Sequence, residues 1–597
     1  MSIVPLARVS LCGARADKEA TLADLQALGV VHLIPLREAP PLAPSDPEAR
    51  RRAQTAFRHL METPEPLRPY RPGTAFDRDA VIARILDNRR ELRELRDRRD
   101  DLRERIAELA PWGDFTLPPA DALAGMRLWL YPLPIKERAA LDRLELPWAV
   151  VGRGPTTLHV AVVSREEPPL DALPVRHIRA GDAPLSALRA ELDGVEIAIE
   201  EAEHARAALT RWRLLLGADL AAAEDADARR DAGEGTLDER EFFAVQGWAP
   251  EDAVPELDAL AAARGMALLA EPPAPADTPP TLLRSPEGVA GASDLTNFYT
   301  SPGYRSWDPS LVVFASFAVF FAMILADAGY AALIAAATAL FWKRLGANAT
   351  GTRLRVILAA LAGASLVYGA LVGSYFGVAP PPGSLLAAVE VIDIENFETM
   401  MAISVIAGAI HLTVAHGAVA WLARRRGGEI WAPLGWIVAI WGGILAWLGG
   451  DGATALGLGL VAAGLAGVFW GSAAKLPVAT PLDWLKRLGA GAMSLTGITR
   501  KFGDLLSYLR LFALGLASAS LAATFNGLAM DIHAANPGLG LLFAVLVLLF
   551  GHTVTFLLGV MSGVVHGLRL NFIEFFGWGL TEEGYPFKAF AKREAPA

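Results

Sequence analysis

Hydrophobic and charged positions divide this chain into two unlike halves. Up to about residue 290, apolar residues lie in short alternating stretches or at heptad spacing, and charged residues fill most positions between them. Beyond residue 290, the apolar residues form long runs. Six runs are long enough to cross a lipid bilayer: 353–378, 399–423, 430–449, 452–474, 505–530 and 538–579. The pattern therefore predicts a soluble module followed by a membrane module.

Two long amphipathic helices are predicted in the soluble half. The first has apolar residues at the a and d positions of a heptad: Ile85, Leu92, Leu95, Leu102, Ile106 and Leu109. The second repeats the pattern: Leu188, Leu192, Val195, Ile199, Ala202, Leu209 and Leu216. Each helix of about 30 residues would be about 45 Å long. We expect an antiparallel coiled coil over 79–112 and 185–216, a structure that usually serves as a stalk or spacer.

Globular α/β units are predicted at both ends of this coiled coil. They are a distal tip, residues 113–184, and a proximal unit formed by 1–75 and 217–270. The strands expected in the tip are 128–131, 148–151 and 158–163. Those expected in the proximal unit are 7–11, 30–34 and 242–248. The predicted fold is thus a set of α/β units joined by a long antiparallel coiled coil over residues 1–290, followed by an all-α multi-span membrane domain over residues 291–597.

The charge distribution follows the same division. The net charge is −10, but residues 1–290 carry 37 Lys and Arg against 49 Asp and Glu, whereas residues 291–597 carry 18 against 16. This balance excludes a strongly basic nucleic-acid-binding domain. The single cysteine, Cys12, excludes an intrachain disulfide and a cysteine-based metal site. Because the soluble half contains no P-loop and no Gly-rich dinucleotide turn, we expect a mechanical arm there.

Charges between the apolar runs predict the orientation of the membrane module. Basic and acidic loops alternate, as at Arg424–Arg426 and then Asp451, which places the C-terminus in the cytoplasm. The N-terminal half is expected there too, since its first apolar stretch is short and lacks a basic flank. A further apolar run, 311–341, has Asp327 near its middle and a basic segment, 342–355, after it. We expect a shallow hairpin that bends near Asp327; the alternative is one full crossing.

Four charged residues lie within the apolar runs: Asp327, Arg510, Arg569 and Glu574. A charge at mid-membrane costs about 2.5–3.5 kcal/mol even on the most lenient scale, so each is a candidate for function. Arg510 is the most informative, because Gly503, Ala513 and Ala517 on its helical face would let another surface approach closely. Arginine is always protonated. It can therefore attract a carboxylate on a moving partner and displace its proton, and it blocks a direct proton leak.

Arg569 repeats this arrangement in the last apolar run. His566 and Glu574 lie within one or two turns of it and can titrate or hold water. The alternative is that Arg569 extends to the membrane interface and only anchors its helix.

The residues around both arginines resemble the signatures of a known family. Ser507 to Leu514 (SYLRLFAL), His566 to Phe576 (HGLRLNFIEFF) and Gly584 to Phe587 (GYPF) are similar to those of the large membrane subunit of V-type and archaeal-type rotary ATPases, called subunit a in eukaryotes and subunit I in prokaryotes. Weaker matches occur in the expected order: Gly29 to Leu33, Gly247 to Pro250, Asp308 to Ser310, Asp327 to Tyr330 and Gly369 to Gly377. The resemblance covers essentially the whole chain.

The resemblance implies a stator subunit beside a rotating ring of proteolipid subunits, each with a membrane carboxylate. Protons would enter by one half-channel, travel on the ring and leave by another. Arg510 would be the essential arginine that separates the half-channels, and Arg569 its second arginine. Asp327 and His411 would line the outer half-channel. The remaining residues of the implied ion-translocation set are Asp504, Ser507, His566 and Glu574.

The resemblance also implies partners and a location. The partners would be the proteolipid ring, peripheral-stalk subunits, the central-stalk cap subunit, the lipid bilayer and, indirectly, the soluble sector that hydrolyses or synthesises ATP. No cofactor, catalytic site or nucleic acid is expected for this subunit by itself. Members have eight membrane helices, and six runs plus a split 311–341 would give about eight, the last two long and tilted. The cell membrane is the expected location, with a cytoplasmic N-terminal domain.

The chain departs from the family pattern at two positions. Eukaryotic members often have His eight residues after the first arginine and Glu ten residues before the second, where this chain has Ser518 and Gly559. These differences weaken the transfer of those two proton-relay sites and leave both arginines in place. H⁺ and Na⁺ members share the motifs, and we expect H⁺ as the commoner ion. The alternatives are a secondary transporter with a cytoplasmic coiled-coil regulatory domain, or a coiled-coil signalling receptor.

Overall fold

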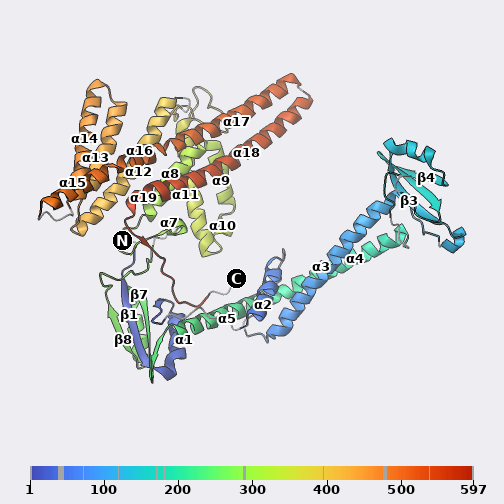
Figure 1. Cartoon of the computed structure of the whole chain (residues 1–597), viewed down its shortest axis with the longest axis horizontal. Coiled ribbons are helices and arrows are strands. Elements are labelled where there is room, and N and C mark those ends of the chain that lie inside the picture. Colours follow the sequence, from blue (N-terminus) through green and yellow to red (C-terminus); the bar gives the residue numbers. More distant parts are fainter. Residues whose placement is uncertain are drawn as a thin grey trace. The chain divides into compact units, whose positions relative to one another are not determined.

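A computed structural model describes residues 3–37, 46–71, 73–118, 120–169, 173–178, 183–284, 286, 289, 291–393, 396–474, 480–536 and 538–593. The chain divides into two compact units (Figure 1). The first, which we call the membrane unit, comprises Met1–Ala14, Val30–Ile34 and Asp238–Phe590. The second, the arm unit, comprises Arg15–Gly29, Pro35–Leu237 and Ala591–Ala597. The domain limits predicted from the sequence remain a prediction.

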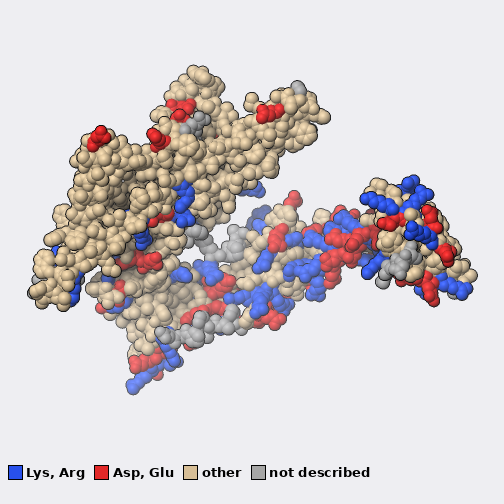
Figure 2. Space-filling view, turned by 45° about the horizontal axis from the view of Figure 1, so that its top comes forward, with Lys and Arg blue, Asp and Glu red and all other residues tan. Residues whose placement is uncertain are grey.

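The arm unit is built on long polar helices. Their bounds are α1 (Lys18–Leu28), α2 (Pro47–Met61), α3 (Arg78–Leu109), α4 (Leu185–Leu209) and α5 (Arg213–Glu234). Asp77 begins α3 by accepting a hydrogen bond from the backbone N–H of Ala80 at 3.1 Å. The apolar heptad positions of α3 that face its neighbours are buried, and Figure 2 shows the rest of this helix pair covered by charged side chains.

Helices α3 and α4 lie antiparallel to each other. Arg96 pairs with Glu203 and Arg103 with Glu196, so residue numbers rise on one helix as they fall on the other. The two helices and their antiparallel direction agree with the sequence prediction. Their supercoiling into a coiled coil remains a prediction.

A three-stranded antiparallel sheet follows α3. Its strands are β3 (Arg127–Pro134), β4 (Trp148–Arg153) and β5 (Thr157–Ser164), in the order β3-β5-β4. Its core includes Leu133, Val160 and Val162, which are fully buried. These strands confirm the three that were predicted between the two long helices.

The membrane unit contains a second antiparallel sheet. Its strands are β1 (Leu6–Ala14), β2 (His32–Ile34), β6 (Leu237–Glu239), β7 (Phe242–Pro250) and β8 (Ala267–Glu271), with the main order β2-β7-β1-β8, and α6 (Val254–Ala263) precedes β8. Arg8 of β1 stands opposite Trp248 of β7, which confirms that the 242–248 segment returns to the first strand. The C-terminal segment also reaches this sheet, where the N–H of Phe590 donates to the carbonyl of Val31 at 2.7 Å.

The rest of the membrane unit is helical. The helices are α7 (Gly291–Tyr299), α8 (Ser310–Leu325), α9 (Ala328–Leu340), α10 (Trp342–Leu345), α11 (Ala349–Val372), α12 (Phe397–Arg425), α13 (Trp431–Leu448), α14 (Asp451–Ala473), α15 (Pro481–Leu495), α16 (Gly497–Leu506), α17 (Leu509–Ala535), α18 (Leu539–Arg569) and α19 (Phe576–Gly579). Short strands β9 (Ser301–Pro302) and β10 (Glu583–Gly584) pair with each other. On the face shown in Figure 2, charged side chains are sparse over this bundle.

The number of membrane-capable segments differs from the prediction of about eight. Within the described residues, six helical segments are long and apolar enough to cross a membrane: 350–372, 397–425, 431–448, 451–473, 481–535 and 539–579. The remaining apolar run is broken into α8 and α9, of 16 and 13 residues. They are about 24 and 20 Å long, each shorter than a hydrocarbon core of about 30 Å.

The break between α8 and α9 has the form of a hairpin. Near the start of α11, Arg353 pairs with Asp294 of α7 at 2.6 Å, and the Arg355 guanidinium lies 4.7 Å from the ring centroid of Trp342. At the other end of α11, the N–H of Ala328 donates to the carbonyl of Ser374 at 2.8 Å. Helix α7 and the end of the segment therefore lie beside the start of α11, and the bend of the segment lies beside the end of α11. This arrangement is compatible with the hairpin, which remains a prediction.

Helices α13 and α14 form the tightest pair of the bundle, side by side in Figure 1. Glycines recur every seven residues on the facing sides: Gly435 and Gly442 on α13, and Gly457, Gly464 and Gly471 on α14. A Cβ at position 464 would lie 2.5 Å from the carbonyl oxygen of Gly435. The obstacle is a backbone atom, which cannot move away as a flexible side chain can. The two helices can therefore approach this closely only because glycine occupies these positions.

We expect Gly464→Leu to separate α13 from α14 and to lower the melting temperature of the purified protein in detergent. Overpacking costs about 1–3 kcal/mol, and a backbone obstacle places this site at the upper end. Gly459→Leu is the matched control, because a Cβ at position 459 of the same helix has nothing within 4 Å. Equal melting temperatures for the two variants would contradict the proposed close packing.

His59, a buried histidine of the arm unit, makes the stability of this unit depend on pH. His59 of α2 has its Nε2 3.2 Å from Oδ1 of Asn88 on α3, and the amide of Asn88 donates to the carbonyl of Ala202 on α4. Burial, the largest cause, lowers the pKa of His59 below its usual value. The folded arm therefore binds a proton at this ring less readily than the unfolded arm does.

We predict that the contacts of His59 are stable above about pH 6.5, the usual histidine pKa, and weaken as the pH falls below it. Hydrogen exchange of α2 and α3 in the full chain, corrected for intrinsic rates at pH 7.5 and 5.5, measures this loss. His59→Gln should show a smaller difference between the two pH values. If His59→Gln showed the same pH dependence as the wild type, the loss of protection at low pH would be due to other groups.

Candidate functional site

Arg510 lies at the start of α17, just after a break in the helix. Helix α16 ends at Leu506 and α17 begins at Leu509. The Arg510 side chain is largely buried, and its Nη1 lies 4.0 Å from Oε1 of Glu574. Glu574 is 2% exposed, so its carboxylate lies inside the protein. The Arg510 guanidinium is its ion-pair partner among the described residues. Two residues predicted from distant parts of the sequence are thus brought together.

Glu574 occupies a wide helical turn. Residues Leu570–Phe575 form a π-helical turn between α18 and α19. Such turns are rare and occur often at functional sites, because one extra residue per turn moves the following side chains to another face. This turn follows Arg569, the last residue of α18, and directs Glu574 inward.

The second arginine belongs to the same electrostatic group. The positive charges of Arg510 and Arg569 both act on Glu574 and on His566. Ser507 lies near the same carboxylate, and its hydroxyl donates to the carbonyl of Gly503 at 3.1 Å. The structure therefore gathers five of the eight predicted residues into one group, which consists of Glu574 and four neighbours: Arg510, Arg569, His566 and Ser507.

Asp504 lies one turn before Ser507, at the edge of this group. Its Oδ2 accepts a hydrogen bond from the indole N–H of Trp578 at 2.6 Å and lies 3.8 Å from Nε of Arg500. On the same face, Nζ of Lys501 lies 2.7 Å from Nε2 of His416 and 3.2 Å from the ring centroid of Trp578. Lys501 is buried, and the sequence analysis did not single it out because it resembles the other members of a basic cluster.

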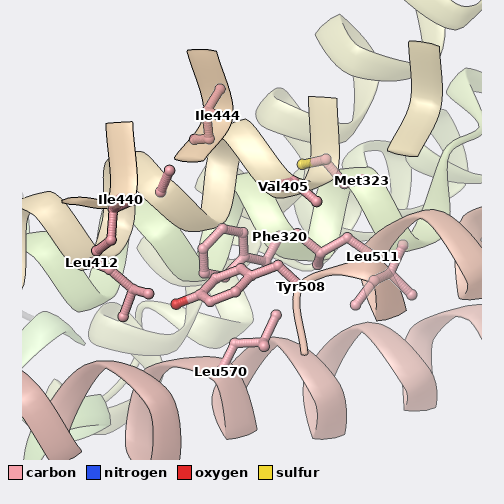
Figure 3. Packing of buried hydrophobic residues seen from close by; sticks show 11 residues of the cluster. Phe320, Met323, Val405, Leu412, Ile440, Ile444, Tyr508, Leu511 and Leu570 are labelled. Atoms are coloured by element: carbon pink, nitrogen blue, oxygen red, sulfur yellow. The ribbon is translucent and has the colours of Figure 1, made fainter. Parts of the chain in front are cut away.

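His411 reaches the arginine group through an aromatic side chain. Its Nδ1 lies 2.8 Å from the hydroxyl of Tyr508, and its ring stacks on Phe575 with centroids 4.3 Å apart. Tyr508 is fully buried, and Figure 3 shows it packed among Phe320, Leu412, Leu511 and Leu570. Gly408 makes room for it, since a Cβ there would lie 2.5 Å from Tyr508 Cγ. Tyr508 lies inside the recognised motif, but its partner could not be read from the sequence.

Asp327 lies elsewhere and is fully hydrogen-bonded. Its Oδ1 accepts from the N–H groups of Tyr330 at 2.9 Å and Phe376 at 3.0 Å. Its Oδ2 accepts from the Ser374 hydroxyl at 2.7 Å and the N–H of Gly377 at 2.8 Å. Among the described contacts, Asp327 shares no partner with His411, so the structure does not bring these two predicted half-channel residues together.

Several polar atoms of the arginine group have no hydrogen-bond partner among the described residues. They are Arg510 Nη1, Glu574 Oε2, His411 Nε2 and His566 Nδ1, all buried. Buried polar atoms usually have a partner, so these remain able to bind water or a group on another chain. No group of three or more His, Cys, Asp or Glu side chains that could hold a metal ion occurs within the described residues.

Curated relatives show which proteins the chain is similar to. It is 27% identical over 422 residues to "V-type ATP synthase subunit I" of Chlamydia pneumoniae, covering 59% of the chain and 61% of that protein. It is 28% identical over 454 residues to "A-type ATP synthase subunit I" of Methanocaldococcus jannaschii, covering 69% and 64%. With "V-type ATP synthase subunit I 1" of Treponema pallidum, identity is 27% over 643 aligned positions, covering 99% and 100%. The chain is thus similar to several proteins named V-type or A-type ATP synthase subunit I.

Two further comparisons add little to this homology. No protein-family model matches the chain. A crystal structure of the cytoplasmic N-terminal domain of subunit I, homolog of subunit a, of V-ATPase is 18% identical and covers 44% of the chain and 99% of that domain, with a TM-score of 0.21. That TM-score is too low to establish a shared arrangement. The matches span less than two thirds of the first two subunit I relatives, and the whole length of the third.

Two departures from the eukaryotic subunit a pattern face each other in this subunit I homologue. A Cβ at position 559 on α18 would lie 3.5 Å from Oγ of Ser518 on α17 and 3.0 Å from Cδ1 of Leu325. The positions that often carry Glu and His in eukaryotic members therefore meet here as a small pair beside a leucine. The middle of the contact between α17 and α18 has no titratable side chain at this point.

We expect Asp327→Asn to destabilise the protein, because each oxygen accepts two of the four bonds and an amide nitrogen in place of either one would face two donors. A buried donor left unsatisfied costs about 1–3 kcal/mol. Thermal unfolding in detergent measures the loss, and Asp531→Asn, which changes an exposed carboxylate on α17, is the control. Equal stability of the two variants would show that the four bonds do not hold the hairpin bend.

Proposed function

We propose that this chain is the membrane stator subunit of a V/A-type rotary ATPase or ATP synthase, non-catalytic by itself. It would provide the proton half-channels against the rotating proteolipid ring and anchor the peripheral stalks. The observation that carries the proposal is the pairing of the partly buried Arg510 with the buried Glu574, with the exposed Arg569 acting on the same carboxylate, where α17 and α18 lie side by side. The names of the subunit I relatives support the same role.

The geometry suits a charge that opposes a passing carboxylate. Arg510 keeps its proton at any physiological pH, so its field favours the ionised form of a carboxylate that approaches it. The 4.0 Å distance to Glu574 is longer than a hydrogen bond. The guanidinium is therefore not saturated by its neighbour and can act on a ring carboxylate. Between two half-channels, the same fixed charge would block a proton from passing directly.

The other predicted elements fit this role. The antiparallel helices α3 and α4 would be the coiled-coil stalk, with the β3–β5–β4 sheet as a docking tip for a peripheral-stalk subunit. A central-stalk cap subunit and the soluble ATP sector would complete the assembly. The six membrane-capable segments support a multi-pass protein in the cell membrane, and its N-terminal domain would be cytoplasmic.

Arg510→Ala tests the role directly. We expect loss of ATP-driven proton pumping in vesicles that contain the whole complex, with the complex still assembled. Arg510→Lys should also fail, because an amine does not reproduce the fixed, forked guanidinium. Arg424→Ala, at the exposed end of α12, is the matched control and should pump normally. Normal pumping by Arg510→Ala would refute the proposed role.

Purification separates this proposal from a secondary transporter with a cytoplasmic coiled-coil domain. A stator subunit should co-purify with small proteolipids and ATPase subunits after gentle solubilisation. Isolation of the chain without such partners, together with transport of a small solute, would favour the transporter.

A further inference from the structure

A row of hydrogen-bonded polar groups, which we call the His552 row, crosses the bundle far from the arginine cluster. The hydroxyl of Tyr330 on α9 lies 2.7 Å from Nδ1 of His552 on α18. Nε2 of His552 lies 3.0 Å from Oδ1 of Asn526 on α17, and the amide nitrogen of Asn526 donates to the carbonyl of Phe376 at 2.9 Å. Four segments therefore meet at one histidine, which the arginine cluster does not use.

The hydrogen bond from Asn526 to the carbonyl of Phe376 fixes the direction of the other bonds in the row. A backbone carbonyl only accepts, so the Asn526 amide nitrogen must face Phe376, and Oδ1 must face His552. That oxygen also only accepts, so Nε2 of His552 carries a hydrogen. In the neutral ring Nδ1 is then the acceptor, and the hydroxyl of Tyr330 donates to it. His552 thus presents one basic nitrogen to one hydroxyl group.

The same geometry accepts a second proton without moving any heavy atom. In a protonated ring Nδ1 donates to the Tyr330 oxygen, and the tyrosine hydroxyl hydrogen must turn to another acceptor. Thr555 lies three residues after His552 on α18, close enough to Tyr330 to interact with it, and we take its hydroxyl oxygen as that acceptor. A hydroxyl that rotates between two acceptors therefore serves both charge states of His552.

Asp327 holds both ends of the His552 row, Tyr330 and Phe376, in place. One of its oxygens accepts from the N–H of Tyr330 and from the N–H of Phe376. Phe376 has φ of 55°, a conformation that is unfavourable for a residue with a side chain and that these bonds maintain. Asp327 acts on His552 through Tyr330 and Phe376, which makes it a positioning residue.

The His552 row lies well away from the arginine cluster. Asn526 lies 16 residues after Arg510 on α17, and His552 lies 17 residues before Arg569 on α18. These spacings correspond to about 24 and 26 Å along the helices. The predicted topology places the basic cluster before α17 in the cytoplasm, so the His552 end of the two helices faces the outside. An ionisable group within membrane helices is by default a candidate for function.

Few other charged groups surround His552. Asp327 and Tyr330 face it from α9 and its cap, and the Glu390 carboxyl lies over Gly373 in the adjoining loop. Along α17 the other titratable residues are Arg510, Asp531 and His533, and along α18 they are His566 and Arg569. Within the described residues, none of these α17 and α18 residues is hydrogen-bonded to Tyr330, His552 or Asn526.

We propose that His552 is a reversible proton-loading site of the outer half-channel, with Asn526 and Asp327 as its positioning residues. This rests on the proposed function. As a proton moves inward, the O–H bond of Tyr330 breaks while the Nδ1–H bond of His552 forms. The Tyr330 oxygen takes a replacement proton from a hydronium ion, which becomes water. Release runs through the same two bonds in reverse.

The test uses the whole complex in vesicles and varies the pH on the outer side of the membrane. His552→Gln keeps a polar side chain that cannot titrate. We expect assembly and ATP hydrolysis to be retained, proton pumping to fall several-fold, and one titration step to disappear from its dependence on outer pH. Tyr330→Phe keeps the backbone bond to Asp327 and should have the same effect. His533→Gln on α17 is the matched control and should leave the pH profile unchanged.

The outcomes separate this inference from the function on which it rests. If Arg510→Ala abolishes pumping while both His552→Gln and Tyr330→Phe pump with the wild-type pH profile, the loading site is refuted and the stator role stands. If Arg510→Ala also pumps normally, the stator role itself is refuted. Should His552→Gln not assemble, Tyr330→Phe decides, because it leaves the ring in place and removes only the hydroxyl.

Discussion

A carboxylate buried in an apolar helix bundle must be stabilised by donors or by a positive charge, and the rest of this membrane unit depends on how two carboxylates meet that requirement. Asp327 receives four hydrogen bonds from two segments, the start of α9 and the loop after α11, and leaves no oxygen free, so it fixes the hairpin bend of α8 and α9 against the end of α11. Glu574 has one oxygen without a partner among the described residues and a guanidinium 4.0 Å away. The first therefore builds structure, whereas hydrogen bonds do not saturate the second.

Close approach of backbones is what brings such polar groups within reach of one another. The loop after α11 can donate to Asp327 because Gly369 and Gly377 have no side chains, and a Cβ at 377 would lie 2.5 Å from Cβ of Ala522 on α17. Gly408 does the same for Tyr508, which then reaches His411. Small residues thus determine where hydrogen bonds form in a bundle whose surfaces are otherwise apolar.

The sequence predicts local structure here and fails on long-range partners. Apolar run length and heptad spacing predict the membrane-capable helices and the helix pair α3 and α4. Short alternating stretches predict β3, β4 and β5 and, in the other sheet, β1, β2 and β7, but not β6 or β8. Intramembrane charge identifies Arg510, Arg569 and Glu574. Periodicity tells which face of a helix is buried but not which residue it meets, so the pairs Asp327 with Ser374 and His552 with Tyr330 could not be predicted. The π-helical turn after Arg569 also shifts Glu574 from the face that a 3.6-residue period would give it.

The contact between α17 and α18 separates two groups of polar side chains with an apolar stretch. One end carries Arg510, Arg569 and Glu574, the other carries Asn526 and His552, and between them Ser518 and Gly559 meet beside Leu325. A continuous row of titratable groups would let protons pass along the two helices without a moving carrier. The middle contributes no titratable side chain and the arginine end holds a fixed positive charge, so no row of proton carriers within this contact joins the two groups. Under the proposed function, a carboxylate on a moving ring would carry protons across that gap.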